Sequence, residues 1–205
     1  TLYFNGPRYL ILREEFYKYK GECKDAEKQR EINDIRKVLL TFGGSDPSNL
    51  TLKVLDDLLS LERELEVNIV LGPLFGRLKK LNEILRKHKS KAKTVKMYKD
   101  FENIAKLMCE SDIVITHPGL TMFEALFIGV PVIAVYQNQL QERVYQPFFD
   151  KVGEKTNFLN LSVTNFLVHP KNEHIKELNI GQGRMEIIEA ITNHNAIEEL
   201  NTTAK

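Results

Sequence analysis

The hydrophobic positions from residue 37 onward form short apolar runs that alternate with amphipathic stretches. The runs are rich in β-branched residues and stop at glycine, proline or polar residues, which is typical of buried strands. The stretches between them repeat apolar positions every three or four residues, which predicts helices. The predicted strands are Lys37–Phe42, Val67–Leu71, Thr94–Met97, Asp112–Thr116, Val130–Tyr136 and Asn157–Leu161. The predicted helices are Leu50–Leu61, Phe75–Lys89, Phe101–Glu110, Leu120–Ile128, Gln141–Val152 and an interrupted tail, Asn172–Leu200.

Strands that alternate with helices of this length need crossover connections, which produce a parallel sheet with helices on both faces. We therefore predict an α/β domain over residues 37–200. Residues 1–36 do not continue the alternation, because the short apolar stretch Tyr9–Leu12 is followed by the mostly charged stretch Lys18–Arg36. We interpret residues 1–36 as a leading segment or an interdomain linker.

Composition narrows the function classes. The formal net charge is +1, so no strong field favours nucleic acid or an acidic membrane surface as a partner. The chain has neither a long apolar run nor a charged-then-apolar leader, so we expect no membrane span and no secretion. Its two cysteines, Cys23 and Cys109, are too few for a disulfide framework or a zinc site. We expect separate thiols, with Cys109 in the core and Cys23 at the surface, in a reducing cytoplasm, and neither metal nor cofactor.

The loop Gly43–Asp46 follows the first strand, at the sheet edge where such domains bind ligands. Two glycines let the backbone approach a ligand closely, and the next helix begins with free amides that attract anions. A plain turn with Ser45 or Asp46 as helix cap is an equally good alternative. The loop lacks both the G-x-G-x-x-G and the Walker pattern, which disfavours NAD-dependent dehydrogenases and P-loop NTPases.

The loop after the fourth strand is the second candidate. Gly119 and the amides of Leu120 and Thr121 can hold a diphosphate at the helix N-terminus. Glu124 lies one turn into that helix, where its carboxylate can accept hydrogen bonds from ribose hydroxyls or simply complement the helix dipole. His117 either contacts phosphate as a cation or caps the helix, or it is a surface or packing residue.

Amides dominate the loop after the fifth strand. Gln137, Asn138 and Gln141 offer both donors and acceptors, which suits the hydroxyl and acetamido groups of a sugar. The alternative is an ordinary polar helix start.

Together these loops resemble the C-terminal half of GT-B enzymes, in which two Rossmann-like domains face each other across a cleft. The matching motifs are T-F-G-G-S-D-P at 41–47, H-P-G-L-T-M-F-E-A at 117–125, G-V-P-V-I at 129–133 and Q-N-Q-L-Q at 137–141. Among such enzymes, the chain resembles the UDP-sugar hydrolase of pseudaminic acid synthesis and the related spore coat polysaccharide biosynthesis proteins. It resembles more distantly the N-acetylglucosaminyltransferase that makes the peptidoglycan lipid intermediate.

The resemblance covers residues 7–190, in which Tyr9–Phe16 is similar to the segment that joins the two GT-B halves. It implies nine residues at the nucleotide: Gly43, Gly44, Ser45, Tyr98, His117, Gly119, Leu120, Thr121 and Glu124. It implies three at the sugar: Gln137, Asn138 and Gln141. Leu120 stands where the family usually has serine, which removes a hydroxyl from the phosphate loop and keeps the amide.

The implied function is UDP-sugar binding within a hydrolase that cleaves a UDP-linked amino sugar at its anomeric carbon. A UDP-sugar glycosyltransferase of surface polysaccharide synthesis and a non-catalytic nucleotide-sugar-binding module are the alternatives. The implied partners are the UDP-sugar and an N-terminal GT-B domain of the same protein. The catalytic residue is expected in that domain, so no position here is assigned to it and the chain alone is expected to be inactive.

Overall fold

The computed structural model describes residues 3–23, 35–88, 93–99, 101–155, 161–162, 165–168, 170 and 172–192. Within these residues seven strands form one sheet, in the order β3-β2-β1-β4-β5-β7-β6. Their bounds are β1 Lys37–Thr41, β2 Leu65–Leu71, β3 Lys93–Lys99, β4 Ile113–Thr116, β5 Val132–Val135, β6 Gly153–Lys155 and β7 Asn165–Val168.

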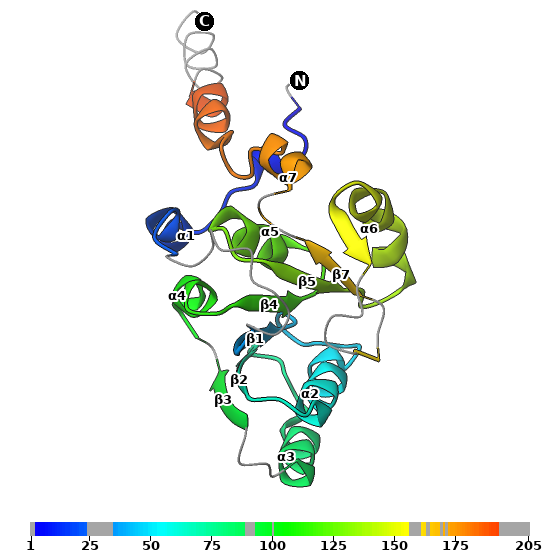
Figure 1. Ribbon diagram of the computed structural model, residues 1–205. Coiled ribbons are helices and arrows are strands. Elements are labelled where there is room, and N and C mark those ends of the chain that lie inside the picture. The colour runs from blue at the N-terminus through cyan, green and yellow to red at the C-terminus, as the bar shows by residue number, and fades with distance from the viewer. Residues whose placement is uncertain are drawn as a thin grey trace, which may run out of the picture.

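Helices cover both faces of this sheet, with α2 and α3 on one side and α1, α4 and α5 on the other (Figure 1). Their bounds are α1 Glu14–Tyr19, α2 Leu50–Ser60, α3 Leu78–Lys87, α4 Ile104–Cys109, α5 Leu120–Phe127, α6 Gln139–Val152 and α7 Glu173–Glu177. A short 3-10 helix, η1, spans Pro7–Tyr9, and residues 184–192 are helical. The predicted α/β architecture is confirmed.

The five strands from β3 to β5 run parallel. The strand order reverses between β1 and β4, and open α/β sheets bind ligands at such a switch point, in the crevice outside the carboxyl ends of the strands. Beyond β5 the sheet ends in two strands that were not predicted, β7 and β6, and both contacts of β7 are antiparallel. The sixth predicted strand, Asn157–Leu161, lies outside the described residues apart from Leu161.

Strand β1 shows why the central runs are apolar at every position. Val38 and Leu40 pack with the residues of α2 and α3, whereas Leu39 packs with those of α4 and α5, and all three side chains are buried. A strand covered on both faces has no polar side, which explains the continuous hydrophobic pattern. This central position holds the β1 loop over the middle of the sheet.

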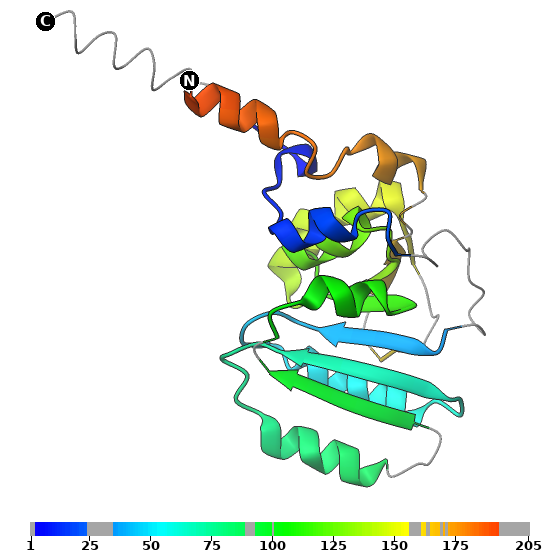
Figure 2. The same ribbon diagram turned by 90° about the vertical axis from the view of Figure 1, so that its left-hand side faces the viewer.

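The N-terminal segment packs against the domain. Leu12 and Phe16 are buried in the same core as α4 and α5. The amides of Gly181 and Gly183 donate to the carbonyls of Pro7 and Arg8, which places η1 beside the residues that precede helix 184–192 (Figure 2). A linker role for residues 1–36 stays a prediction.

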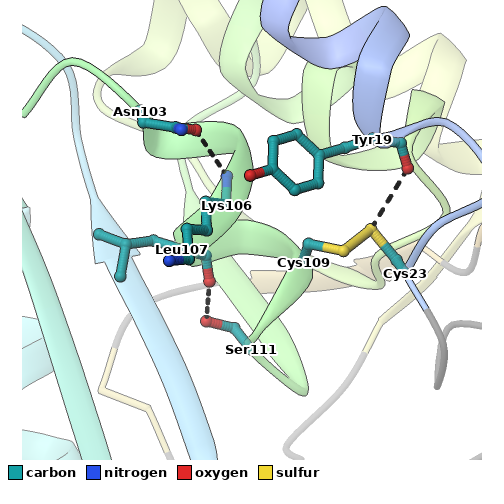
Figure 3. The surroundings of a disulfide bond; sticks show 7 residues. All are labelled: Tyr19, Cys23, Asn103, Lys106, Leu107, Cys109 and Ser111. Carbon is teal, nitrogen blue, oxygen red and sulfur yellow. Dashed lines mark hydrogen bonds between the residues drawn. A yellow bond between two sulfur atoms is a disulfide. The ribbon is translucent and has the colours of Figure 1, made fainter.

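The expectation of two separate thiols is wrong. A disulfide joins Cys23, just after α1, to Cys109 at the end of α4, and Cys23 is buried (Figure 3). The packing of α1 against α4 brings the two residues together across a sequence separation of 86. Neither the number nor the spacing of the cysteines in the sequence indicates this tertiary contact. The disulfide also removes the observation on which a reducing cytoplasm was expected.

Candidate functional site

The loops after β1 and β2 are in direct backbone contact. A Cβ atom at Gly72 would overlap the carbonyl oxygen of Gly43 and the Cα of Gly44, so only glycine fits there. The amide of Leu74 donates to the carbonyl of Gly44 at 3.0 Å. The loop after β2 therefore packs against the backbone of Gly43 and Gly44, and it leaves Gly43, Gly44 and Ser45 exposed.

The loops after β1 and β4 meet across the switch point. Gly43 has a φ of 75°, and a Cβ there would lie 3.2 Å from Nε2 of His117. The imidazole of His117 thus lies over the glycine turn. Two predicted nucleotide residues, 74 positions apart by their numbers, share one end of the crevice.

Gln141 joins the loops after β4 and β5. Its Nε2 donates to the carbonyl of Pro118 at 2.7 Å and lies 3.2 Å from Nδ1 of His117. Its Oε1 accepts from the amide of Gln137 at 2.8 Å. The hydroxyl of Ser48 in turn donates to the carbonyl of Gln137 at 2.6 Å, which ties the β1 loop to the β5 loop. All three loops predicted from the sequence converge.

These contacts define the protonation of His117. Its Nδ1 lies 2.9 Å from the carbonyl oxygen of Pro118, which can only accept, so we assign the Nδ1 proton to that bond. The other ring nitrogen, Nε2, faces Gly43. It accepts a hydrogen bond when the ring is neutral and donates one when the ring is charged. His117 can therefore bind an anionic oxygen in its charged form.

The N-terminus of α2 is already occupied. The Asp46 carboxylate is buried and accepts from the amides of Leu50 and Thr51, both at 2.8 Å. The alternative of a helix cap in this loop is thus realised by Asp46. Because these amides are bound by a carboxylate, they do not provide the anion site that the sequence suggested.

The N-terminus of α5 is different. Asn138 caps α6 by accepting from the Gln141 amide at 2.9 Å, but no described side chain caps α5, which begins after Gly119. The amides of Leu120 and Thr121 lie in that first turn, where backbone donors and the helix dipole attract negative charge. Of the three helices that follow these loops, α5 is the one whose first turn no described side chain caps.

Glu124 lies one turn further along α5, and its side chain is only 3% exposed. Burial raises the pKa of its carboxyl, while hydrogen bonds and charge attraction from Arg13 oppose that rise and Glu15 adds to it. Arg13 Nε lies 3.2 Å from Oε1, and Nη2 lies 3.5 Å from Oε2. Both oxygens of the predicted ribose acceptor therefore face the guanidinium of Arg13.

The remaining predicted residues are less clearly placed for a ligand. Asn138 and Gln141 are engaged in loop contacts, so their role at a sugar stays a prediction. The hydroxyl of Tyr98 donates to Asn68 in the middle of β2 at 3.4 Å, and its ring packs against Phe101. Its side chain is thus turned back along the sheet, and the backbone at the end of β3 remains the candidate for contact with a base.

Three residues that organise the site were not predicted. Arg13 and Ser48 make the contacts described above, and Arg77 Nη1 donates to the carbonyl of Asp46 at 3.1 Å. Each acts across a long sequence separation, so no local motif indicates it. The only available signal was that Arg13 lies inside the stretch Tyr9–Phe16 that resembles the GT-B connecting segment.

Comparison with known families agrees with this geometry. Residues 38–168, more than half of the chain, match the model of the glycosyltransferase family 28 C-terminal domain. The chain belongs to this family. The family 28 domain therefore contains every strand from β1 to β7 except the first residue of β1, together with all three candidate loops. The predicted resemblance to the C-terminal half of GT-B enzymes is confirmed.

Three relatives illustrate the range of the family. An uncharacterized protein of Methanocaldococcus jannaschii is 50% identical over 94% of this chain and 38% of its own length. The spore coat polysaccharide biosynthesis protein SpsG of Bacillus subtilis is 29% identical over 74% of this chain and 42% of its own length. The UDP-2,4-diacetamido-2,4,6-trideoxy-beta-L-altropyranose hydrolase of Campylobacter jejuni is 29% identical over 67% of this chain and 44% of its own length.

The chain thus spans less than half the length of each of these relatives. Among the residues that the structure describes, no helix is long and apolar enough to cross a membrane. The same residues contain no group of three or more histidine, cysteine or acidic side chains arranged to hold a metal ion.

Proposed function

We propose that this domain binds the nucleotide of a UDP-sugar at the crevice between β1 and β4. The observation that carries the proposal is the uncapped N-terminus of α5, which lies beside His117 and Gly43 at the switch point of the sheet. The amides of Leu120 and Thr121 would bind the diphosphate, with the Thr121 hydroxyl as a further donor. Family membership, the polysaccharide-related name of the Bacillus relative and the UDP-sugar in the name of the Campylobacter relative support a sugar nucleotide as the ligand.

The rest of the nucleotide would follow the sheet edge. Glu124 would accept the ribose hydroxyls, and the backbone at the end of β3, beside Tyr98, would contact the uracil. Gly43, Gly44 and Ser45 would face the diphosphate from the opposite loop, where their exposure leaves room for a ligand. Gln137, Asn138 and Gln141 would lie towards the sugar.

The chemical role of such a site is to stabilise the departing UDP. When the bond between the anomeric carbon and the diphosphate oxygen breaks, negative charge develops on that oxygen. Fixed helix amides and the nearby His117 side chain stabilise this charge without reorganising during the reaction. The attacking oxygen is water in a hydrolase and an acceptor hydroxyl in a transferase, and either one needs a base. We assign that base to an N-terminal GT-B domain of the full protein.

We favour the hydrolase because the Campylobacter relative carries that name, and the alternative is a glycosyltransferase because the family description names that activity. Both would act in the cytoplasm, where the disulfide would need protection from reduction by its burial. A non-catalytic module is the third candidate, favoured by Leu120 in place of the usual serine. We expect no nucleic acid partner and no cofactor.

Two measurements test this function. Calorimetry should detect UDP binding to this chain, and Thr121→Val and Glu124→Ala should each weaken it by roughly ten- to hundredfold, as expected for a lost hydrogen bond to a charged group. The full-length protein should then release UDP and free sugar from a UDP-sugar in water alone. Release only when an acceptor is added would favour the transferase, and tight binding without turnover would favour the module. No UDP binding to the chain would reject the site.

A further inference from the structure

The Glu124 carboxylate is closed off by a residue from the N-terminal segment. Arg13 precedes α1 and covers Glu124 on α5, with its Nε and Nη2 near the two carboxylate oxygens. The Arg13 side chain is 50% exposed, whereas that of Glu124 is 3% exposed. A ligand that approaches from solvent therefore meets the guanidinium before the carboxylate.

Arg13 has two partners besides Glu124, and both lie on α1. Its Nη1 lies 2.9 Å from Oε1 of Glu15, and its guanidinium carbon lies 5.0 Å from the ring centre of the buried Phe16. An arginine can therefore leave Glu124 and still be paired and stacked on α1. Opening the contact does not leave an isolated charge on the arginine side.

Glu124 has no such freedom. A buried carboxylate that loses its donors carries a large desolvation cost, and burial already disfavours the charged form of this one. A ligand that displaces Arg13 must therefore bring two hydrogen-bond donors spaced to reach both oxygens. The vicinal hydroxyls of a ribose meet this requirement, whereas a ligand without them leaves the carboxylate unpaired.

We propose that the Arg13 guanidinium and the ribose hydroxyls of the nucleotide compete for the same carboxylate, and that the hydroxyls replace the guanidinium at Glu124 when the nucleotide binds. This inference rests on the proposed function, which assigns the ribose to Glu124. Because the ion pair must open, its free energy subtracts from the affinity for the nucleotide. Binding also breaks the contact between the Arg13 side chain and α5, so nucleotide occupancy and the position of that side chain are linked in both directions.

The test compares UDP with 2′,3′-dideoxy-UDP by calorimetry on this chain. Arg13→Met keeps the aliphatic contact with Phe16 but removes the donors, and it should raise the affinity for UDP by roughly three- to tenfold, the usual range for a partly exposed ion pair. The dideoxy ligand lacks the two hydroxyls that replace the guanidinium, so Arg13 stays on Glu124 when it binds and its affinity should not change. Arg8→Met is the matched control, because Arg8 pairs with Glu186 instead, and it should change neither affinity.

If Arg13→Met does not fold, Arg13→Lys serves in its place, since lysine keeps the charge but not the planar pair of donors. It should also raise the affinity for UDP, by a smaller factor. Weaker or unchanged UDP binding in the folded Arg13 variant, with the dideoxy ligand still discriminated, overturns the exchange alone. If the wild-type protein binds both ligands equally and Glu124→Gln changes nothing, the ribose assignment in the proposed function fails instead.

Discussion

The hydroxyl of Ser48 donates a 2.6 Å hydrogen bond to the carbonyl oxygen of Gln137. Ser48 lies between β1 and α2, and Gln137 lies between β5 and α6. In the sheet, β4 lies between β1 and β5. The bond therefore joins the two loops that flank the loop after β4. The three candidate loops are therefore one connected unit.

Ser48→Ala should loosen that unit. The loss of one intramolecular hydrogen bond should lower the free energy of unfolding by about 1 kcal/mol and weaken UDP binding by roughly two- to fivefold, because the loops no longer hold their relative positions. Chemical denaturation and calorimetry measure the two effects. Ser60→Ala is the control, since Ser60 donates a comparable 2.8 Å bond to the Asp56 carbonyl within α2. Equal loss of UDP affinity in both variants would contradict the coupling of the loops.

Asp46 offers a test of the β1 loop itself. Its buried carboxylate holds the first amides of α2, so Asp46→Ala should lower the free energy of unfolding by about 1–2 kcal/mol, the usual value of a lost helix cap. Asp46→Asn keeps one acceptor and tolerates the φ of 44° at this position, so it should cost less. A lower free energy of unfolding for Asp46→Asn than for Asp46→Ala, measured by denaturation, would show that the capping interpretation is wrong.

The course of the chain through the sheet could be predicted because each central strand and its covering helices leave a strong local pattern. Val38, Leu39 and Leu40 are all apolar since both faces of β1 are covered, and the glycines after β1 mark its end. The antiparallel edge was missed because β7 is a four-residue strand whose partners, β5 and β6, are set by tertiary packing. Short edge strands carry little periodicity.

The loops of the site could be predicted, but the contacts within them could not. Parallel topology places the ends of β1, β4 and β5 at one edge, which is enough to find Gly43, His117 and Gln141. The sequence did not indicate that Asp46 accepts from the first amides of α2, which leaves the uncapped α5 as the candidate anion site. Arg13 reaches Glu124 across 111 positions, and the sequence contains no local trace of such a pairing.

The Cys23–Cys109 disulfide should contribute measurably to stability. It closes a long loop of the unfolded chain, for which a contribution of about 2–4 kcal/mol is typical. Reductant should therefore lower the denaturation midpoint of the wild-type protein. The double variant Cys23→Ser with Cys109→Ser should match the reduced wild-type protein and be insensitive to reductant. A wild-type midpoint that does not change on reduction would mean that the bond adds nothing to the folded state.

Glu124 should make stability depend on pH. Burial raises the pKa of its carboxyl in the folded protein above the ordinary value of 4.5, so the folded state holds the proton more tightly than the unfolded chain. The stability contributed by the protonated form is complete below pH 4.5 and is lost as the pH rises through the folded pKa. The free energy of unfolding should thus fall relative to that of Glu124→Gln across this window. If the free energy of unfolding of the wild-type protein, relative to that of Glu124→Gln, stays constant or rises across this window, the hydrogen bonds and charge of Arg13 affect the pKa of Glu124 more than burial does.

Gly72 should be irreplaceable for a reason that lies in another loop. A methyl group there would overlap the backbone of Gly43 and Gly44, so Gly72→Ala must push the β1 loop away from the β2 loop. Overpacking of this kind costs about 1–3 kcal/mol, and the displaced glycines should also bind UDP more weakly.

Gly76→Ala is the matched control, because a Cβ at Gly76 would meet nothing within 4 Å. It should be neutral or slightly stabilising, since alanine restricts the unfolded chain. Because both substitutions lie in the segment between β2 and α3, similar denaturation midpoints and similar UDP affinities in the two variants would show that contact between the β1 and β2 loops does not set the shape of the crevice.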